Sequence, residues 1–286
     1  MSTDPLSLDV YVAPMRPYTS PDQLGEGEVA TWAPSSSTLI SGPTEGILID
    51  ALLTFDNADQ IAEMAKRSGK NITGVYITHG HGDHWLGLAR LLEHFPDARG
   101  FAAPEVAARA AWEADIDKKT GYWTSRFPGE LPETPVLPEE ISDDEIMVDG
   151  QVVNLIHIGQ GDIDGSTIFH VPAADAVVAG DVVYNNVHMM FYEADAAKRE
   201  AWIASIDAIA ALNAKTVVAG HKSVGAADLP ENTLAVSQQY VRDFNASAKD
   251  AGTVEDIVNR MLELHGERDQ PHTLWISARA EIARRA

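Results

Sequence analysis

Apolar residues recur with two different periods in the first half of the chain, and each period predicts a different kind of element. Short apolar runs predict strands, whereas apolar residues three and four positions apart predict helices. Residues 38–41 and 46–51 form two such runs around Gly-Pro-Thr-Glu, which predicts a hairpin. Helical spacing follows at Ile61, Met64 and Ala65. Beyond it, the pattern predicts a buried strand at 72–79, a helix at 84–95 and a strand at 98–104.

The second half of the chain repeats this order of elements. Apolar runs predict strands at 146–150, 151–159, 166–172 and 176–184, a helix at 197–213 and a strand at 215–221. The tail predicts two or three helices within 234–249, 253–266 and 272–286. Two halves with a similar order of strands and helices predict two sheets packed face to face with helices outside.

The chain shows no repeat of fixed period and no linker, so we expect one domain over residues 1–286. Residues 104–140 differ from the rest, because a predicted helix is followed by a stretch rich in proline and aromatic residues. This composition predicts a lid-like excursion over a surface. A helical C-terminal extension is expected from about residue 230.

Composition narrows the class of protein. Hydrophobic residues make up 45% of the chain and charged residues 22%, as in soluble globular proteins, and the net charge is -22. So acidic a surface disfavours nucleic acid and membranes as partners. With no cysteine, any metal must be held by nitrogen and oxygen. The N-terminal residues lack the pattern of a signal peptide, and we expect a cytoplasmic enzyme with a small-molecule substrate. The sequence leaves a homodimer open.

Three of the ten histidines fall in the stretch THGHGDHW at residues 78–85. His79 and His81 lie two apart at the end of a predicted strand, so their side chains project to the same side. Asp83 and His84 follow in the turn into a helix, where they can point at a second centre. Protonated imidazoles this close repel one another, whereas a metal cation that binds their neutral forms holds them together. A solvated polar loop or a helix cap would account for one histidine, whereas the whole pattern predicts a metal site.

The motif and its downstream partners resemble the metallo-β-lactamase superfamily over residues 37–223. AGDVVY contains Asp181, which matches the metal-bridging aspartate of the family, and VVAGHKS contains His221, which matches its last metal histidine. GILIDA contains Asp50, which matches an aspartate that supports the ligands from behind. The resemblance implies an αββα sandwich of two mixed β-sheets flanked by helices. It also implies a metal site made by His79, His81, Asp83, His84, Asp181 and His221.

The remaining ligand departs from the family pattern. The family has a histidine in a turn after a strand, and the matching turn IGQGDIDGST has Asp162 at that position. A carboxylate binds zinc at a distance similar to that of imidazole, so Asp162 is the preferred ligand. His157 is an alternative, although it lies inside a predicted strand, where packing or edge exposure is its simpler role.

This departure has a consequence for the metals. With Asp83, Asp162 and Asp181 ionised, three negative charges face two divalent cations, and a shared hydroxide brings the centre to about zero. A histidine in place of Asp162 would leave one positive charge. The more neutral centre should acidify water less and accept manganese or iron more readily. We expect two divalent metal ions, with zinc as the first choice.

The resemblance implies hydrolysis by a hydroxide that the two metals generate, with Asp83 orienting it. Superfamily members act on β-lactams, thioesters, lactones, phosphodiesters and sulfate esters, so the fold alone does not choose. The best-known β-lactamases carry cysteine where this chain has Asp181, and the charge disfavours a polyanion. An ester or lactone carbonyl is therefore the expected target, and thioester hydrolysis or β-lactamase-like activity is the alternative.

Tyr184 is the second predicted catalytic residue. It follows Asp181 by three positions, as a substrate-contacting tyrosine does in the acyl homoserine lactonases. Aromatic residues of the lid-like segment and the loop YNNVHMMFY are expected to form an apolar pocket, although covering of hydrophobic surface explains them equally well. The predicted pocket residues are Trp85, Trp123, His188 and Met189.

Two readings of another class stay open. A mononuclear iron dioxygenase needs only His79, His81 and a residue such as Asp181, and a non-catalytic metal-binding relative needs no intact first site. The presence of Asp83, His84 and His221 together favours the dinuclear hydrolase.

Overall fold

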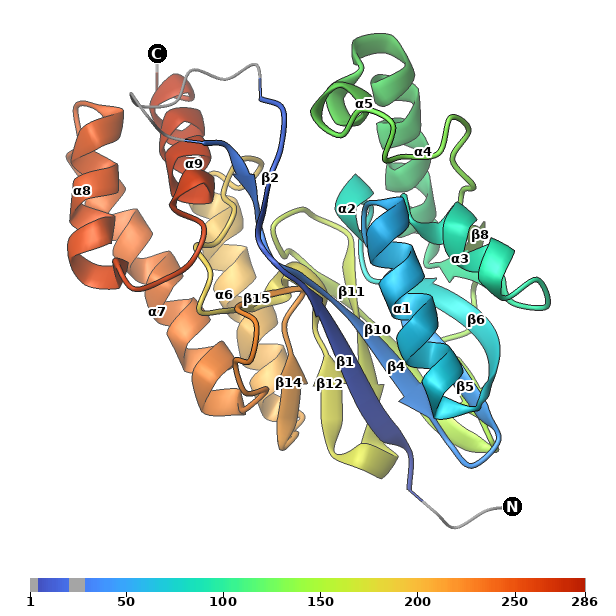
Figure 1. Cartoon of the computed structure of the whole chain (residues 1–286). Helices are drawn as coiled ribbons and strands as arrows, with labels where there is room; N and C mark the ends of the chain where they lie inside the picture. Colours follow the sequence, from blue (N-terminus) through green and yellow to red (C-terminus); the bar gives the residue numbers. More distant parts are fainter. Residues whose placement is uncertain (1–4, 21–28, 286) are drawn as a thin grey trace.

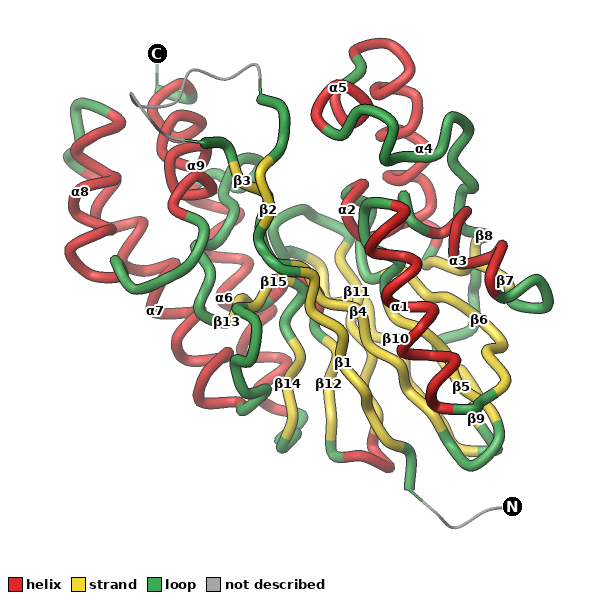
Figure 2. The backbone as a smooth tube through the Cα atoms, viewed as in Figure 1, coloured by secondary structure: helices red, strands yellow, loops and turns green. Residues whose placement is uncertain are grey.

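The computed structural model describes residues 5–20 and 29–285. Two large β-sheets lie in the middle of the molecule, and helices cover the outer side of each (Figure 1). The tube in Figure 2 shows the strands of both sheets running side by side between the two groups of helices. Both sheets contain parallel and antiparallel pairs. This arrangement confirms the predicted αββα sandwich.

The larger sheet has eight strands in the order β13-β15-β4-β5-β6-β7-β8, and β1 also pairs with β4. The predicted hairpin is present as β4 and β5, which pair antiparallel. The strands of this sheet are β1 (Ser7–Ala13), β4 (Ser35–Ser41), β5 (Glu45–Ile49), β6 (Asn71–Ile77), β7 (Arg99–Ala102), β8 (Glu139–Glu140), β13 (Tyr184–Asn185) and β15 (His221–Lys222).

The smaller sheet has five strands in the order β14-β12-β11-β10-β9. A separate two-stranded sheet pairs β2 (Arg16–Pro17) with β3 (Thr31–Trp32). The strands of the five-stranded sheet are β9 (Glu145–Val148), β10 (Gln151–Gly159), β11 (Ser166–Val171), β12 (Ala176–Val178) and β14 (Thr216–Val218).

One group of helices packs on the larger sheet, where α1 contacts β1, and both α3 and α4 contact β7. The other group packs on the smaller sheet through α6 against β10 and α7 against β14, with α8 and α9 outside them. None of the helices in the described ranges is long and apolar enough to cross a membrane. The helices are α1 (Phe55–Ser68), α2 (Gly82–Trp85), α3 (Leu88–His94), α4 (Pro104–Thr120), α5 (Tyr122–Arg126), α6 (Ala196–Ala211), α7 (Pro230–Lys249), α8 (Val254–His265) and α9 (Pro271–Ala283).

Local sequence explains both ends of α1. The Thr54 side chain accepts a hydrogen bond from the backbone N–H of Asn57, and the Asn57 side chain accepts one from the backbone N–H of Thr54. This capping box satisfies two amide groups that the first helical turn leaves unpaired. Gly69 ends the helix in the left-handed region with φ of 69°, which glycine adopts without strain.

The helix predicted at 84–95 is two helices, α2 and α3, separated near Gly87. The backbone N–H of Gly87 donates to the carbonyl oxygen of Leu52 over 2.8 Å. A Cβ atom at Gly87 would lie only 2.3 Å from the carbonyl oxygen of Ala51. The prediction of one helix was therefore wrong, because this close backbone contact interrupts a helical pattern that is continuous in sequence.

Two predicted strands are also divided, and both divisions occur where the chain passes from one sheet to the other. The strand expected at 176–184 leaves the smaller sheet after β12, turns at Gly180 and enters the larger sheet as β13. The strand expected at 215–221 leaves after β14 and enters the larger sheet as β15. These two crossings place Asp181 and His221 at the same edge, between the sheets.

Residues 104–140 form α4, α5 and β8 and are packed into the fold. Trp123 and Phe127 are buried, and the carbonyl oxygen of Glu130 accepts a hydrogen bond from the backbone N–H of Phe55 at the start of α1. The segment that the sequence predicts to be lid-like is thus an anchored wall. The tail predicted as helical contains the three helices α7, α8 and α9. Helix α8 packs against both α7 and α9.

Candidate metal centre

The seven side chains predicted to bind metal all meet at the edge where the two sheets face each other. They come from the loop after β6, from α2, from the turn between β10 and β11, and from the two crossings between the sheets. The backbone carbonyl of Thr78 accepts hydrogen bonds from the N–H and the hydroxyl of Thr167, which joins the two sheets beside the site. The grouped residues are His79, His81, Asp83, His84, Asp162, Asp181 and His221.

The first cluster consists of His79, His81 and Asp162. Asp162 Oδ2 lies 2.6 Å from His81 Nδ1, and Asp162 Oδ1 lies 3.6 Å from His79 Nε2. The alternative ligand His157 is on β10, half exposed, and pairs with Glu105 and Asp144 at the surface. The structure therefore places Asp162 in the cluster and His157 outside it.

The second cluster consists of Asp83, His84 and His221. Asp83 Oδ2 lies 3.8 Å from His84 Nε2 and 3.4 Å from His221 Nε2. Each cluster thus offers two imidazole nitrogens and one carboxylate, and all of them come from the predicted set.

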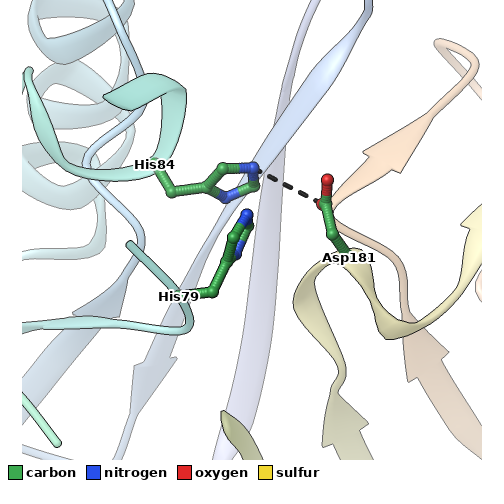
Figure 3. A group of neighbouring side chains, drawn as sticks. All are labelled: His79, His84 and Asp181. Atoms are coloured by element: carbon green, nitrogen blue, oxygen red, sulfur yellow. Dashed lines mark ion pairs between the residues drawn. The ribbon is translucent and has the colours of Figure 1, made fainter. Parts of the chain in front are cut away.

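Asp181 lies between the clusters. Its Oδ1 is 3.4 Å from His84 Nε2, and its Oδ2 is 3.1 Å from His221 Nε2. Figure 3 shows His79, His84 and Asp181 pointing toward one another, from residues 78–85 (the metal-binding loop) on one side and the sheet crossing on the other. Gly220 makes this position available, because a Cβ atom there would lie 2.1 Å from Asp181 Oδ1.

Unpartnered polar atoms show that the cluster fits a cation. His79 Nε2, His84 Nε2 and Asp181 Oδ1 are buried and have no hydrogen-bond partner among the described residues. Leaving such atoms unpaired costs free energy, which coordination to a metal removes. Imidazole nitrogen and carboxylate oxygen are ligands that divalent zinc, iron and manganese share. The arrangement therefore fits divalent metal ions.

The charges of the cluster lead to the same conclusion. Burial lowers the pKa of His84, but Asp181, Asp50 and Asp83 outweigh burial and raise it to about 9. Burial is outweighed in the same way at His221, whose pKa is well above its ordinary value. These imidazoles in turn keep the pKa of Asp83 and Asp181 low in spite of burial. The ionised carboxylates therefore require positive charge, which protons supply until a metal displaces them.

Asp50 supports the second cluster from behind, as predicted from its place after β5. One oxygen accepts a hydrogen bond from the backbone N–H of Thr78 over 2.8 Å. The other is within 2.9 Å of both the Thr78 hydroxyl and His84 Nδ1. Its backbone has φ of 63°, a conformation that aspartate tolerates better than most residues and that these contacts maintain. Asp50 therefore fixes the ring so that Nε2 faces the ligand site.

Sequence reasoning missed further contacts that orient the second cluster. His221 Nδ1 donates to the carbonyl oxygen of Pro34 over 2.9 Å, at the start of β4. Trp32 Nε1 donates to Asp83 Oδ2 over 3.3 Å from β3. The supporting groups, Pro34 and Trp32, are far in sequence from the ligands that they contact, so no local motif marks them.

The first cluster is supported by a chain of charged residues that the sequence also did not reveal. His81 Nε2 lies 3.4 Å from Glu193 Oε1. Arg109 holds both oxygens of Glu193, at 2.6 and 2.9 Å, and also donates to Glu113 over 3.0 Å. Glu113 accepts hydrogen bonds from the backbone N–H of Gly82 and from Trp123 Nε1. This chain connects α4 and the loop before α6 to the metal-binding loop.

Tyr184, which was predicted to contact substrate, makes a further contact that the sequence did not predict. Its hydroxyl donates to Asp181 Oδ2 over 2.8 Å, and its ring stacks on His221 with centroids 5.3 Å apart. Burial and the charge of Asp181 raise the pKa of Tyr184 well above its ordinary value, so the phenol keeps its proton. In the structure this proton is directed at Asp181, one of the predicted metal ligands.

A cavity of 540 Å³ opens over the clusters, and Asp83, Asp162 and Asp181 are at its inner end. One wall is α4 and α5, and the opposite wall is α9 with the short strand β3. The C-terminal helix α9 contributes Thr273, Ile276, Arg279 and Ala280 to the cavity, although no sequence pattern placed the tail there.

Of the four predicted pocket residues, only Trp123 lines this cavity. Trp85 is fully buried below the metal-binding loop, and its Nε1 donates to the carbonyl oxygen of Gly80. His188 is buried against the Tyr240 hydroxyl, 2.8 Å away, and Met189 is buried in the core between the smaller sheet and its helices. The prediction was wrong for these three residues, because their side chains pack in the interior of the protein and do not reach the cavity.

Comparison with known proteins agrees with the fold and with the grouping of the predicted ligands. A model of the metallo-beta-lactamase superfamily matches residues 30–221. A metallo-beta-lactamase family protein of Thermus thermophilus has 21% identity and a TM-score of 0.58, with 96% of this chain and 91% of that chain covered. A metallo-beta-lactamase from Pontibacter korlensis has 15% identity and a TM-score of 0.58, with coverage of 85% and 97%. Curated proteins give no match.

These structural matches establish the fold, and the family model covers the metal-binding loop, Asp162, Asp181 and His221. The chain belongs to the metallo-beta-lactamase superfamily.

Proposed function

We propose that the chain is a dinuclear metal-dependent hydrolase that attacks the carbonyl carbon of an ester or lactone, with zinc as the resident metal. The observation that supports this is the pair of clusters, each with two imidazoles and one carboxylate, on either side of Asp181. A mononuclear site would not need the second set of ligands. When bound, the metal ions would lower the pKa of a water molecule and polarise the carbonyl group.

The protein's own residues have defined tasks in this reaction. Asp83 has a carboxylate at the inner end of the cavity, held by Trp32, and can orient the attacking water or accept its proton. Tyr184 orients Asp181 through its hydrogen bond. The aromatic side chains of the walls keep bulk water away from the reacting carbonyl.

The volume of the cavity supports a small-molecule substrate. A cavity of 540 Å³ is within the range of pockets that bind drug-sized ligands. The charge of -22 disfavours a polyanionic substrate such as nucleic acid. Ester and lactone carbonyls fit both observations, and thioesters and β-lactams remain the rival substrates for the test.

The test combines metal analysis with a substrate panel. Protein purified without added metal should contain about two equivalents of divalent metal, mostly zinc. It should then hydrolyse aryl esters or lactones faster than thioesters and β-lactams. One equivalent of iron with no hydrolysis would contradict the proposal and favour an oxidoreductase. Metal-loaded protein that binds no member of the panel and turns over none would favour a non-catalytic relative.

A further inference from the structure

The distribution of aromatic residues around the cavity is uneven. The chain has six tryptophans, seven tyrosines and seven phenylalanines. Three of the tryptophans and four of the tyrosines line the cavity, whereas none of the phenylalanines among the described residues does. Phenylalanine is wholly apolar and packs well in protein cores. Tryptophan and tyrosine combine a flat apolar face with a polar edge, and this combination suits surfaces that bind ligands. This selection indicates a binding surface rather than incidental covering of the core.

The inner aromatic residues are held in fixed positions. The rings of Trp32 and Trp123 meet edge to face with centroids 5.1 Å apart, and Tyr18 packs against Trp32 in the same manner at 5.6 Å. Trp123 is held further by its hydrogen bond to Glu113. Rings with so little freedom lose little entropy when a ligand packs against them.

The outer aromatic residues are exposed at the cavity. The exposed fractions are 52% for Trp112, 42% for Tyr122 and 60% for Tyr192. Trp112 and Tyr122 come from the wall made by α4 and α5, and Tyr192 comes from the loop before α6. Exposed rings of this size contribute little to the core, so a ligand in the cavity can pack on them.

Two acidic side chains and one arginine on the same walls are paired with one another. Glu113 and Glu193 both bind Arg109, and the Arg109 guanidinium stacks over the Trp112 ring at 4.6 Å. Arg126 donates to the carbonyl oxygen of Tyr122 and lies over its ring at 3.9 Å. A charged ligand that bound Arg109, Glu113 or Glu193 would have to break the ion pairs among them, whereas a neutral one leaves these pairs intact. The charge of -22 also repels anionic ligands.

We propose that the substrate is a neutral ester or lactone that carries a planar aromatic ring system, which stacks among Trp112, Tyr122 and Tyr192 while the carbonyl group reaches Asp83 and Asp181. This inference rests on the proposed hydrolase function, and it adds the chemical class of the group next to the carbonyl. The aromatic wall selects by shape and polarisability, and the paired charges exclude ionised analogues.

The first experiment compares four ethyl esters whose carbonyl groups have nearly equal intrinsic reactivity, because two methylenes insulate the carbonyl from the ring. These are the 3-(2-naphthyl)propanoate, the 3-cyclohexylpropanoate, the unsubstituted propanoate, and a naphthyl ester that carries a second, ionised carboxylate. We expect kcat/KM for the naphthyl ester to exceed the cyclohexyl value about fivefold and the propanoate value about a hundredfold. The ionised ester should be the poorer of the two naphthyl substrates. Equal values for naphthyl and cyclohexyl esters, or preference for the ionised ester, would overturn the inference.

The second experiment tests the residues. Trp112→Leu and Tyr192→Ala should each reduce the ratio of naphthyl to propanoate kcat/KM about fivefold or more, with metal content unchanged. Trp112→Phe should restore part of the ratio, because it keeps a ring. Met147→Ala is the matched control, since Met147 is 52% exposed on β9, outside the cavity, and should leave the ratio unchanged. A ratio unaffected in both cavity variants would overturn the assignment of the ring site.

A binding measurement separates failure of this inference from failure of the proposed function. The amide 3-(2-naphthyl)propanamide resists hydrolysis, and calorimetry on the metal-loaded protein reports its affinity. If the amide binds and Trp112→Leu weakens it about fivefold while no ester is hydrolysed, the ring site stands and the hydrolase proposal fails. If esters are hydrolysed and the amide binds no better than propanamide, the hydrolase stands and the ring site fails.

Discussion

The two ligand clusters have the same donors but differ in how one of their histidines is held. The second cluster is fixed from the interior, because Asp50 binds His84 and the carbonyl of Pro34 binds His221. In the first cluster, His79 Nδ1 is likewise within 3.1 Å of the buried Thr78 hydroxyl, but the outer nitrogen of His81 faces Glu193, whose side chain is 31% exposed on a loop.

This difference teaches that equal donor sets need not bind metal equally. Contacts that orient a ligand matter as much as the ligand itself, and buried ones hold it more rigidly. We therefore expect the second cluster to retain its metal more tightly than the first. The first cluster also has a carboxylate, Asp162, where the family pattern has a histidine.

The largest effect is expected from Asp162. Asp162→Ala removes the carboxylate of the first cluster, so the protein should lose about one metal equivalent and its turnover, while the second cluster keeps its metal. Asp162→His should retain binding, because imidazole binds zinc at a similar distance. Elemental analysis and hydrolysis rates measure both. Two metals and full activity in Asp162→Ala would show that Asp162 is no ligand.

A smaller effect is expected from Asp50. Asp50→Asn replaces an acceptor with an amide N–H₂ opposite the groups that donate to it, so His84 loses its orientation. The affinity of the second cluster should fall about 10–100-fold, as measured by competition with a chromophoric chelator. Asp56→Asn, at an exposed position at the start of α1, is the matched control. An unchanged affinity would mean that the packing of His84 alone orients the ring.

Glu193 is the corresponding test of the first cluster. Glu193→Gln keeps the size of the side chain and removes its charge, so the affinity of the first cluster should fall about tenfold, at the lower end of the range for such partners. The effect is smaller than for Asp50 because Glu193 is partly solvated. Glu133→Gln, exposed and outside the cavity, should change nothing. Loss of metal from the second cluster instead would contradict the separate support of the two sites.

The smallest effect is expected from Tyr184→Phe, which removes only the hydroxyl that donates to Asp181. Since Asp181 lies between the clusters, the affinity of both metals should fall about threefold, and kcat by less than about tenfold. A kcat reduced about tenfold with unchanged metal affinity would instead support the predicted contact with substrate. A kcat within about twofold of wild type together with unchanged affinity would leave Tyr184 a packing residue.

Sequence patterns predicted the hairpin of β4 and β5, the helix α1 and the layers of the fold, because the signals for these elements are local. Periodicity, capping residues and glycine act within a few positions of one another. The candidate ligands were named from the sequence as well: the spacing within residues 79–84 indicated four of them, and the resemblance to the family added Asp162, Asp181 and His221.

The divisions at Gly87, Gly180 and Gly220 were not predictable, because each depends on a backbone or side chain that approaches from elsewhere in the fold. The pocket residues failed for a related reason. Trp85, His188 and Met189 lie close in sequence to ligands or to the cavity loop, but sequence distance does not say which side of the chain faces the interior.

By itself the sequence indicated the class of the fold and the residues that the structure brings together as a candidate metal centre. The periods of helix and strand and the spacing of the histidines in residues 78–85 belong to short stretches, and the resemblance to the family added Asp162, Asp181 and His221. Only the tertiary structure decided which distant segments support each ligand and which form the cavity. Glu193, Trp32 and the helix α9 reach the site from separate parts of the chain, and packing rather than any local pattern brings them there.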